Sequence, residues 1–386
     1  MEPLSWGAIV AQMFLQFTPV WIALVVTIAL SMLFQKKLGL YGKLMGSGIG
    51  LIGLGLVLFW LFTALFANLI ITHDPLAVIS GMKNKLPGTP LPDGNDVYAY
   101  YLLGGDNLAR DVFSRMVMGA REVLKIAPAA TLFAFLVGIS LGVPAGYFGG
   151  TFDTVLSFIA NLVLAFPVIL LFYLLVTPEI VQSGLPTAMA AVLFLFPIIF
   201  MCILWNARYL AQPTTRAIYI GTTLVIGLWL YLGLAFNADP LGIISMTPNV
   251  LIVFVSVVFV NSPTVFRIVR GLVLDIQTRD YVSAAKTRGE GPWYIMLWEI
   301  LPNARGPLIV DFCLRIGYTT ILLGTLGFFG LGVSPESPDW GSTINEGRRL
   351  LSIYPHPALP PAIALMSLVL GLNLLADGLR EESLKD

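Results

Sequence analysis

Long apolar runs separated by short polar links dominate the chain. A helix that crosses a bilayer needs about 20 mostly apolar residues. Runs of this kind occupy the ranges 14–34, 46–72, 122–147, 153–178, 186–205, 217–236, 248–268, 306–333 and 357–377. The pattern predicts an all-α polytopic membrane protein with nine spanning helices.

The longest polar, helix-prone run in the C-terminal half is DYVSAAKTRGEGPWYIMLWEILPN, from Asp280 to Asn303. Its first half has residues spaced i, i+3, i+4, i+7, which share one helical face: Tyr281, Ala284, Ala285 and Arg288. The same spacing recurs in Trp293, Met296, Leu297 and Ile300. Gly289 and Gly291 interrupt the pattern, Pro292 can begin a second helix, and Pro302 is expected to end it. We predict two short helices joined by a turn, called the elbow below, shaped to meet another protein.

Composition agrees with membrane insertion. Hydrophobic residues make up 57% of the chain and charged residues 11%, with a mean hydropathy of +0.85. A soluble domain has about 25% charged residues. The formal net charge is zero, which gives no indication of a nucleic-acid partner. The N-terminal MEPLSWGAIV lacks the basic region of a cleavable signal peptide, so none is expected.

Basic residues orient the predicted spans. If the link after the first run is cytoplasmic, thirteen Lys and Arg residues fall inside and eight outside. Because cytoplasmic loops carry an excess of Lys and Arg, we predict that the N-terminus lies outside and that the elbow and the C-terminus lie inside.

Catalytic and metal-binding patterns are missing from the sequence. Gly42-Lys43 is followed by Leu44 and has no glycine-rich loop before it, so it is not a nucleotide-binding P-loop. Neither Gly-x-Ser-x-Gly nor His-Glu-x-x-His occurs. The histidines are His73 and His356, and the cysteines Cys202 and Cys313 lie in apolar stretches without ligand spacing. We expect a non-catalytic chain with no metal or cofactor of its own.

Residues 73–121 form the one long loop, rich in turn formers, and predicted to be periplasmic. Charges alternate through its second half, at Asp106, Arg110, Asp111, Arg115 and Arg121. They can pair with each other, fix the entry helix and offer contacts to a docking protein. Alternatively they form a solvated, self-paired loop cap, because exposed ion pairs contribute little.

Two stretches resemble signatures of bacterial ABC importer permeases. The elbow is similar to their cytoplasmic EAA loop, with matches at Ala284, Ala285, Gly289, Leu301 and Pro302, while Ser283 stands where the family has glutamate. LLGGDNLARDVFSRMVMGAR, from Leu102 to Arg121, resembles a motif of the dipeptide, oligopeptide and nickel permeases.

Three further stretches support the same resemblance. LGVPAGYFGGTFD (Leu141–Asp153) resembles a family turn in which Gly149 and Gly150 allow positive φ and Asp153 can cap the next helix. The proline of AFP (Ala165–Pro167) matches one in the family's next span, where it can free a backbone carbonyl or act as a packing kink. Thr325–Leu351 resembles the family's "SLSFLGLG" segment, with Trp340 placed as an interfacial aromatic. The resemblance covers most of 46–386.

The resemblance implies a type I ABC importer transmembrane domain with a six-helix core and about three extra helices. Residues 1–45 then form an extra N-terminal transmembrane helix and a cytoplasmic link, and 46–386 form the permease domain. Residues 179–250 depart from the family as an inserted helix pair, and 269–305 form the cytoplasmic coupling loop. The extra helices suit a lateral scaffold, a lipid or partner contact, or a regulatory element; peripheral packing is the simplest expectation.

The resemblance also implies partners and roles. The chain is expected in the bacterial inner membrane as the permease subunit of an ATP-driven importer for peptides or peptide-like solutes, with ATP and Mg bound by two separate ATP-binding subunits. A homologous permease would complete a heterodimer, and a periplasmic solute-binding protein would deliver substrate. The predicted ATPase-docking residues are Ser283, Ala284, Ala285, Arg288, Gly289, Leu301 and Pro302. The predicted periplasmic gate or binding-protein contacts are Asp106, Arg110, Asp111, Arg115 and Arg121.

Two other classes of protein are alternatives. A secondary transporter or channel would show an inverted internal repeat and broken substrate-binding helices, and no such repeat is visible in the sequence. A membrane-embedded enzyme would need catalytic groups that are missing.

One pair of charges falls inside an apolar run. Asp311 and Arg315 lie four residues apart on one helical face, where they can pair. Such ions indicate either a functional site or a pair that neutralises itself and snorkels to the cytoplasmic side. We favour the structural pair because both charges lie near the helix start.

Overall fold

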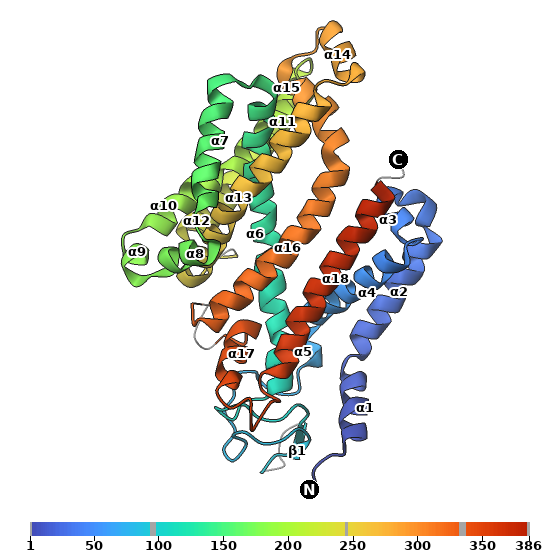
Figure 1. Ribbon diagram of the computed structural model, residues 1–386, viewed down its shortest axis with the longest axis vertical. Coiled ribbons are helices and arrows are strands. Elements are labelled where there is room, and N and C mark those ends of the chain that lie inside the picture. Colours follow the sequence, from blue (N-terminus) through green and yellow to red (C-terminus); the bar gives the residue numbers. More distant parts are fainter. Residues whose placement is uncertain (1, 93–97, 244–245, 332–336, 384–386) are drawn as a thin grey trace. The chain divides into compact units, whose positions relative to one another are not determined.

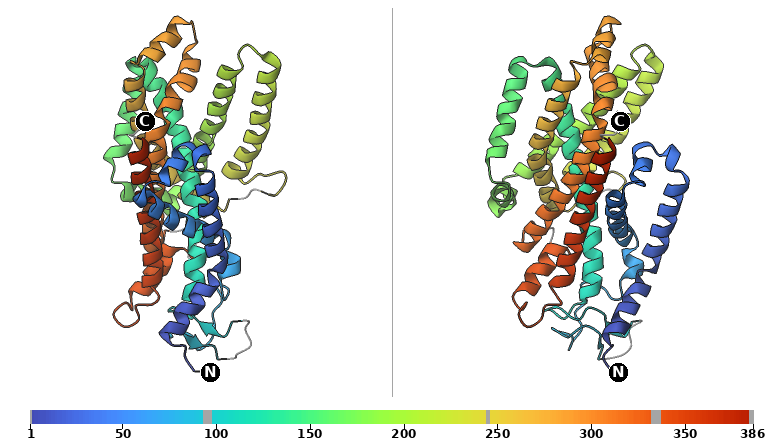
Figure 2. Two further views of the ribbon diagram at one scale, coloured as in Figure 1. Left: turned by 90° about the vertical axis from the view of Figure 1, so that its right-hand side faces the viewer. Right: turned by 45° about the vertical axis from the view of Figure 1, so that its right-hand side comes forward.

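The computed structural model describes residues 2–92, 98–243, 246–331 and 337–383, and its ribbon is drawn in Figures 1 and 2. Five residues of the Thr325–Leu351 stretch, 332–336, lie outside the described residues, among them Gly332, Val333 and Pro335. The chain divides into two compact units, one made of Met1–Pro128 with Cys313–Asp386 and the other of Ala129–Phe312.

The first part of the chain contains α1 (Trp6–Gln16), α2 (Thr18–Leu33), η1 (Gln35–Lys37), α3 (Gly39–Leu44), α4 (Gly48–Leu65), α5 (Ala67–Ile70), β1 (Thr89–Pro90), β2 (Tyr100–Tyr101) and α6 (Val112–Phe148). It continues with α7 (Gly150–Ala165), α8 (Val168–Val176), α9 (Pro178–Gln182), α10 (Leu185–Leu193), α11 (Leu195–Arg208), α12 (Pro213–Phe236) and α13 (Pro248–Ile276). The last part contains α14 (Asp280–Thr287), α15 (Pro292–Tyr294), η2 (Ile295–Ile300), η3 (Leu301–Ala304), α16 (Arg305–Phe328), α17 (Trp340–Arg348) and α18 (Leu359–Ser383).

The predicted spans coincide with helices long and apolar enough to cross a membrane. Within the described residues there are seven such helices, or up to nine when each bent helix pair counts as one span. The first bent pair, α1 and α2, turns by 55°. The second, α7 and α8, turns by 86° at Pro167, which has no N–H to donate and forces Phe166 into an extended conformation. Pro167 therefore breaks its span.

The first unit packs α4 against α18 through small residues. A Cβ on Gly50 would lie 3.3 Å from the Cα of Gly378, and one on Gly53 would lie 2.3 Å from the backbone nitrogen of Leu375. Backbones approach this closely in membrane proteins only where small residues line the contact. At one end Leu4 donates to Gly88 of the long loop, and at the other Gly378 lies beside Leu44 of α3. The N-terminus thus shares an end with the long loop, in keeping with the predicted sidedness.

The second unit packs α6 against α13. Gly138, Gly142 and Gly146 recur every four residues along α6, and a Cβ at each would lie within 3.1 Å of Val265, Val269 or Val273 of α13. Gly149 and Gly150 have φ of +64° and +65°, as predicted for the turn. Asp153 does not cap α7, whose N-cap is Gly149. Its carboxylate instead accepts from Arg270 of α13, at 2.6 Å from Nη2 to Oδ2.

The two apolar runs at 186–205 and 217–236 are helical, with boundaries that differ slightly from the predicted ones. The first apolar run forms α10 and α11, which together give one continuous span from Leu185 to Arg208, and the second forms α12. Helix α10 packs on α13, whereas α11 and α12 lie against each other as an antiparallel pair (Figure 2).

The prediction that Pro302 ends the second elbow helix is wrong. From Pro292 to Phe328 the chain is helical throughout, passing through the π-helical η2 and the 3₁₀-helical η3 into α16. Pro302 lies in the first turn of η3, where a missing N–H costs no hydrogen bond, and the wider π turn before it shifts the backbone register. The elbow is therefore continuous with a membrane span.

Candidate docking elbow and outer-loop network

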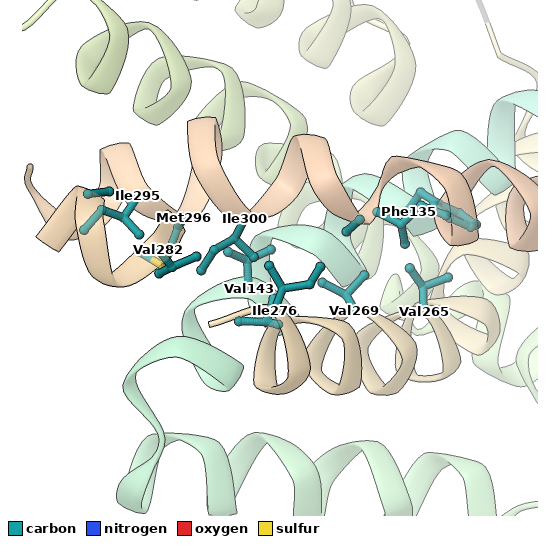
Figure 3. Close-up of a cluster of buried hydrophobic side chains, with 13 residues drawn as sticks. Phe135, Val143, Val265, Val269, Ile276, Val282, Ile295, Met296 and Ile300 are labelled. Atoms are coloured by element: carbon teal, nitrogen blue, oxygen red, sulfur yellow. The ribbon is translucent and has the colours of Figure 1, made fainter. Parts of the chain in front are cut away.

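The first arm of the elbow is α14, which is anchored by its inner face. Val282 and Ala285 are completely buried, three residues apart on one side of the helix. They belong to a hydrophobic cluster that includes side chains of α6 and α13 (Figure 3). The second arm of the elbow, α15 and η2, contributes Ile295, Met296 and Ile300 to this cluster. Both arms thus share one core with the spans beneath them.

The opposite face of α14 is exposed. Tyr281 retains 38% of its accessible surface, and Ser283, Ala284, Lys286 and Arg288 are also exposed. The predicted docking face is therefore corrected at one position, because Ala285 faces the chain's own core and cannot present its side chain to a partner. Leu301 is half-buried against the same cluster and Pro302 is exposed.

The turn between the arms is a Schellman motif. Gly289 N–H donates to Lys286 O at 3.0 Å, and Glu290 N–H donates to Ala285 O at 3.3 Å. This motif needs a residue in the left-handed region after the helix, and Gly289 has φ of +82°. No other group lies within 4 Å of a Cβ placed on Gly289. The requirement for glycine is therefore set by the backbone alone.

Charged and aromatic groups line the outer side of the turn. Arg288 donates from Nη2 to Glu299 Oε1 at 2.8 Å, which ties the first arm to the second. Trp293 remains 41% exposed and Phe148 55% exposed, with their rings 6.4 Å apart. Exposed aromatics and arginine are typical of contact surfaces between proteins.

The charged groups of the long loop form the outer-loop network. Asp106 accepts from Arg110 at 2.7 Å between Oδ2 and Nε, and from the backbone nitrogens of Leu108 and Arg110. The guanidinium of Arg110 also pairs with Glu346 of α17. Arg115 donates from Nη2 to Thr343 Oγ1 at 3.0 Å and to Glu346 Oε2 at 3.3 Å. The network therefore joins two segments that are more than two hundred residues apart in the chain.

Asp111 holds the start of α6. Its carboxylate accepts from the backbone nitrogens of Phe113 and Ser114, from Ser114 Oγ at 2.6 Å and from Thr72 Oγ1 at 3.0 Å. A carboxylate at a helix N-terminus satisfies free N–H groups and interacts favourably with the helix dipole. This aspartate thus fixes the entry helix, as predicted for the alternating charges.

Burial decides between the two interpretations of the loop charges. The fractions of accessible surface that remain exposed are 1% for Asp106, 4% for Arg110, and 0% for both Asp111 and Arg115. The solvated part of the loop-cap interpretation is therefore wrong, whereas its self-pairing is present between Asp106 and Arg110. These four side chains are buried within the chain, and their contact with a binding protein stays a prediction. Arg121 is half-buried and donates to Asn68 Oδ1 at 2.8 Å. A contact between Arg121 and a binding protein stays a prediction.

Trp340 is interior rather than interfacial. Its side chain is completely buried, donates from Nε1 to Met116 O at 2.8 Å, and stacks edge-on against Trp60. A Cβ on Gly119 would lie 2.4 Å from its ring, so only glycine leaves room for it. Asp339 caps α17 through Ser342 N–H, and burial raises the pKa of its carboxyl.

Glu346 and Thr343 complete the network, although the sequence pattern assigns neither of them a role. The available signal was charge balance: from Asp106 to Arg121 the sequence has three arginines and two aspartates, so a paired network needs a further carboxylate. Asp311 and Arg315 both lie in α16, and the Arg315 guanidinium is 6.0 Å from the ring of Tyr318. The pairing of Asp311 with Arg315 stays a prediction.

Across the described residues, no three His, Cys, Asp or Glu side chains gather as a metal site requires.

Comparison with known proteins gives consistent matches. Residues 138–381 match the family described as "Binding-protein-dependent transport system inner membrane component". The glutathione transport system permease protein GsiD of Pectobacterium atrosepticum is 30% identical over 279 residues, which cover 72% of this chain and 70% of the relative. The dipeptide transport system permease protein DppC of Alkalihalophilus pseudofirmus is 28% identical over 341 residues, covering 88% and 87%. The protein of the same description from Haemophilus influenzae is 28% identical over 335 residues.

Proposed function

The chain belongs to the family of binding-protein-dependent transport system inner membrane components, and from that premise we propose that it forms half of a translocation path for peptides or peptide-like solutes. It is a multi-pass protein of the bacterial inner membrane with the fold of a type I ABC importer transmembrane domain, and it acts as a permease subunit. Nothing in the comparisons supports a secondary transporter or channel.

The substrate class rests on the relatives. Their names specify glutathione and dipeptides, which are both short peptides with free carboxylates. We place the substrate of this chain in that class. The periplasmic binding protein would select among such solutes before they reach the permease.

The proposed assembly has four kinds of component. This chain would pair with a homologous permease subunit, and two ATP-binding subunits would bind ATP and Mg and hydrolyse the nucleotide. A periplasmic solute-binding protein would deliver the peptide to the outer face. The chain itself contributes no catalytic group to this cycle.

The elbow is the proposed point of force transfer. Its exposed face, with Ser283, Ala284 and Arg288, would sit on an ATP-binding subunit, and its buried face is joined to α6 and α13 through one hydrophobic cluster. Movement of the subunit would then move the spans as a unit and shift the pair of permeases between inward-open and outward-open states. The observation that carries this proposal is the combination of an exposed outer face with a fully buried inner one.

Gly289→Val tests the elbow, with Gly291→Val as the matched control. Both positions are open, with no other group within 4 Å of the place where a Cβ would lie, but only Gly289 has positive φ; Gly291 has φ of −69°. The left-handed conformation costs a β-branched residue at least ~1–2 kcal/mol, so the turn should rearrange. We expect peptide uptake per ATP hydrolysed to fall about tenfold in Gly289→Val and to stay near wild type in Gly291→Val.

The measurement uses the reconstituted complex in proteoliposomes with its binding protein and a labelled dipeptide, and records uptake and ATP hydrolysis together. Assembly is checked by co-purification of the ATP-binding subunit. Wild-type uptake by an intact Gly289→Val complex would contradict the role of the elbow.

A further inference from the structure

The inserted helices enclose a cavity that the proposed transport function does not use. It has a volume of about 380 Å³ and lies between α11 and α12, closed on its inner side by Phe133 of α6 and by Phe194. The ring of Phe194 packs against those of Phe133 and Phe254, at 5.1 Å and 5.6 Å between centroids. All of these residues belong to the second unit.

The cavity walls are apolar. They include Pro197, Ile198 and Met201 on α11 and Ile226 and Leu234 on α12. Two of the hydroxyls on the wall already bond to the backbone, Thr223 to Tyr219 O at 2.8 Å and Tyr231 to Ala191 O at 3.0 Å. The amides and charges of a peptide would find few hydrogen-bond partners there. A hydrocarbon chain has no polar groups, so it would lose no hydrogen bonds on entering the cavity.

The bilayer has direct access to this cavity. Only 6% of the most apolar 18-residue stretch of α12 is buried within the chain, so most of the surface of this helix is open to contact with lipid. Lipid tails are as apolar as leucine, so an acyl chain passes from the bilayer into such a cavity at little cost. Transfer of the tail alone provides no selectivity, and the head group must supply it.

Aromatic side chains mark the end of the cavity at the link between α11 and α12. Trp205, Tyr209 and Tyr219 stack on one another, with centroids 4.9 Å apart for Trp205 and Tyr219 and 5.0 Å for Tyr209 and Tyr219. Trp and Tyr concentrate where a membrane meets water. This end therefore lies at the level of the lipid head groups.

Two arginines stand beside that aromatic end. Arg208 follows Trp205 by three residues and Arg216 precedes Tyr219 by three, so each lies one helical turn beyond the stack on the same face. Arg208 is exposed, with its guanidinium 4.6 Å from the ring centroid of Trp298. Arginine forms strong bidentate contacts with phosphate, and the positive-inside rule places this link in the cytoplasmic leaflet, which carries anionic lipid.

We propose that this cavity is a binding site for an anionic phospholipid, with one acyl chain between α11 and α12 and the phosphate at Arg208 and Arg216. The inserted helices then serve to hold a lipid against α6. The proposal does not depend on the transport function, and its test contains no transport measurement.

The experiment measures lipid binding to the delipidated full-length chain by native mass spectrometry, with palmitoyl-oleoyl phosphatidylglycerol as the anionic probe and phosphatidylcholine of the same chains as the neutral one. Two arginines at the membrane surface should favour the anionic lipid by about thirtyfold. Thr223→Trp fills the cavity and should lower the affinity for phosphatidylglycerol by about tenfold or more. Val225→Trp, at a position that is 72% exposed and outside the cavity, should leave it within about twofold.

A second variant separates the head-group contact from the cavity. Arg208→Gln combined with Arg216→Gln should abolish the preference for phosphatidylglycerol while both lipids still bind. If Thr223→Trp does not purify as a monodisperse protein, Leu230→Trp fills the same cavity from further along α12. Equal binding of the two lipids to wild type, unchanged binding in the filling variant, or no binding of either lipid would overturn the proposal.

Discussion

Arg110 and Arg115 share two carboxylates, those of Glu346 and Asp106. Both guanidinium groups are nearly or completely buried, while the Glu346 side chain is 20% exposed. A buried cation is tolerated only when it is paired and hydrogen-bonded, because it has lost its hydration. Glu346 therefore stabilises the long loop and α17 together, and single residues in this network carry more free energy than surface ion pairs would.

Glu346→Gln should destabilise the protein by about 2–3 kcal/mol, because it leaves two buried arginines with Asp106 as their remaining carboxylate. Thermal unfolding of the detergent-purified protein measures the loss. Glu122→Gln is the control, since its partner Lys125 is 56% exposed and the pair should contribute under about 1 kcal/mol. Equal effects of the two substitutions would show that burial does not set the strength of the network.

His356 gives the loop a predictable response to pH. Its ring is buried and Nε2 lies 3.1 Å from Gly105 O, a carbonyl that can only accept, so Nε2 carries a proton and donates. Burial lowers the pKa of His356 below its ordinary value of 6.5. The folded state therefore favours the neutral ring, and the stabilisation is complete above pH 6.5 and is lost as the pH falls through that value towards the folded-state pKa.

The unfolding midpoint should accordingly fall between about pH 7 and pH 5, and it should fall less in His356→Gln, whose amide can still donate to Gly105 O. The check is the midpoint temperature of thermal unfolding, measured against pH for wild type and variant. If the two midpoints fall in parallel over this range, His356 is not the titrating group.

At the scale of elements, α6 and α13 meet along a stripe of glycines opposite valines. The contact requires the absence of side chains at Gly138, Gly142 and Gly146, since a Cβ at Gly142 would lie 2.9 Å from Phe266 O and 3.0 Å from Val269 Cβ. Backbone atoms cannot move aside as a flexible side chain can. The same two helices support the elbow cluster, so this packing also determines how firmly the elbow is held.

Gly142→Leu should therefore destabilise the fold by about 1–3 kcal/mol or more through overpacking. Gly221→Leu in α12 is the matched control, because nothing lies within 4 Å of its Cβ position and both changes raise helix propensity. Thermal unfolding compares them. A neutral Gly142→Leu would mean that α6 and α13 can separate without loss.

At the scale of the whole molecule, sidedness follows from the succession of spans along the chain. The positive-inside bias places the long loop outside and the elbow inside. An elbow on the cytoplasmic side is accessible to ATP-binding subunits, and a loop on the periplasmic side is accessible to a binding protein. The transport proposal requires this orientation.

Cysteine labelling tests the orientation. In a chain whose Cys202 and Cys313 are replaced by alanine, Lys83→Cys in the long loop and Ser283→Cys in the elbow are both exposed positions. A membrane-impermeant maleimide applied to spheroplasts should label Lys83→Cys at once and Ser283→Cys only after permeabilisation. Labelling of Ser283→Cys from outside would reverse the topology.

The sequence by itself determined the class of protein, the spans and the existence of the elbow. Apolar run length is a local property, and the left-handed turn at Gly289 and the start of α15 at Pro292 follow from the backbone preferences of those residues. Where the prediction depended on one proline alone, at Pro302, it was wrong, because the preceding π turn changed the local register.

Only the tertiary structure decided which side of each element faces inward. Helical spacing grouped Ala284 with Ala285, but the cluster beneath the elbow selects Val282 and Ala285 as its contacts. Alternating charges in the long loop fit a solvated cap equally well until α17 brings Glu346 to Arg110 and Arg115. Burial is a property of groups brought together from distant parts of the chain, and no local pattern contains it.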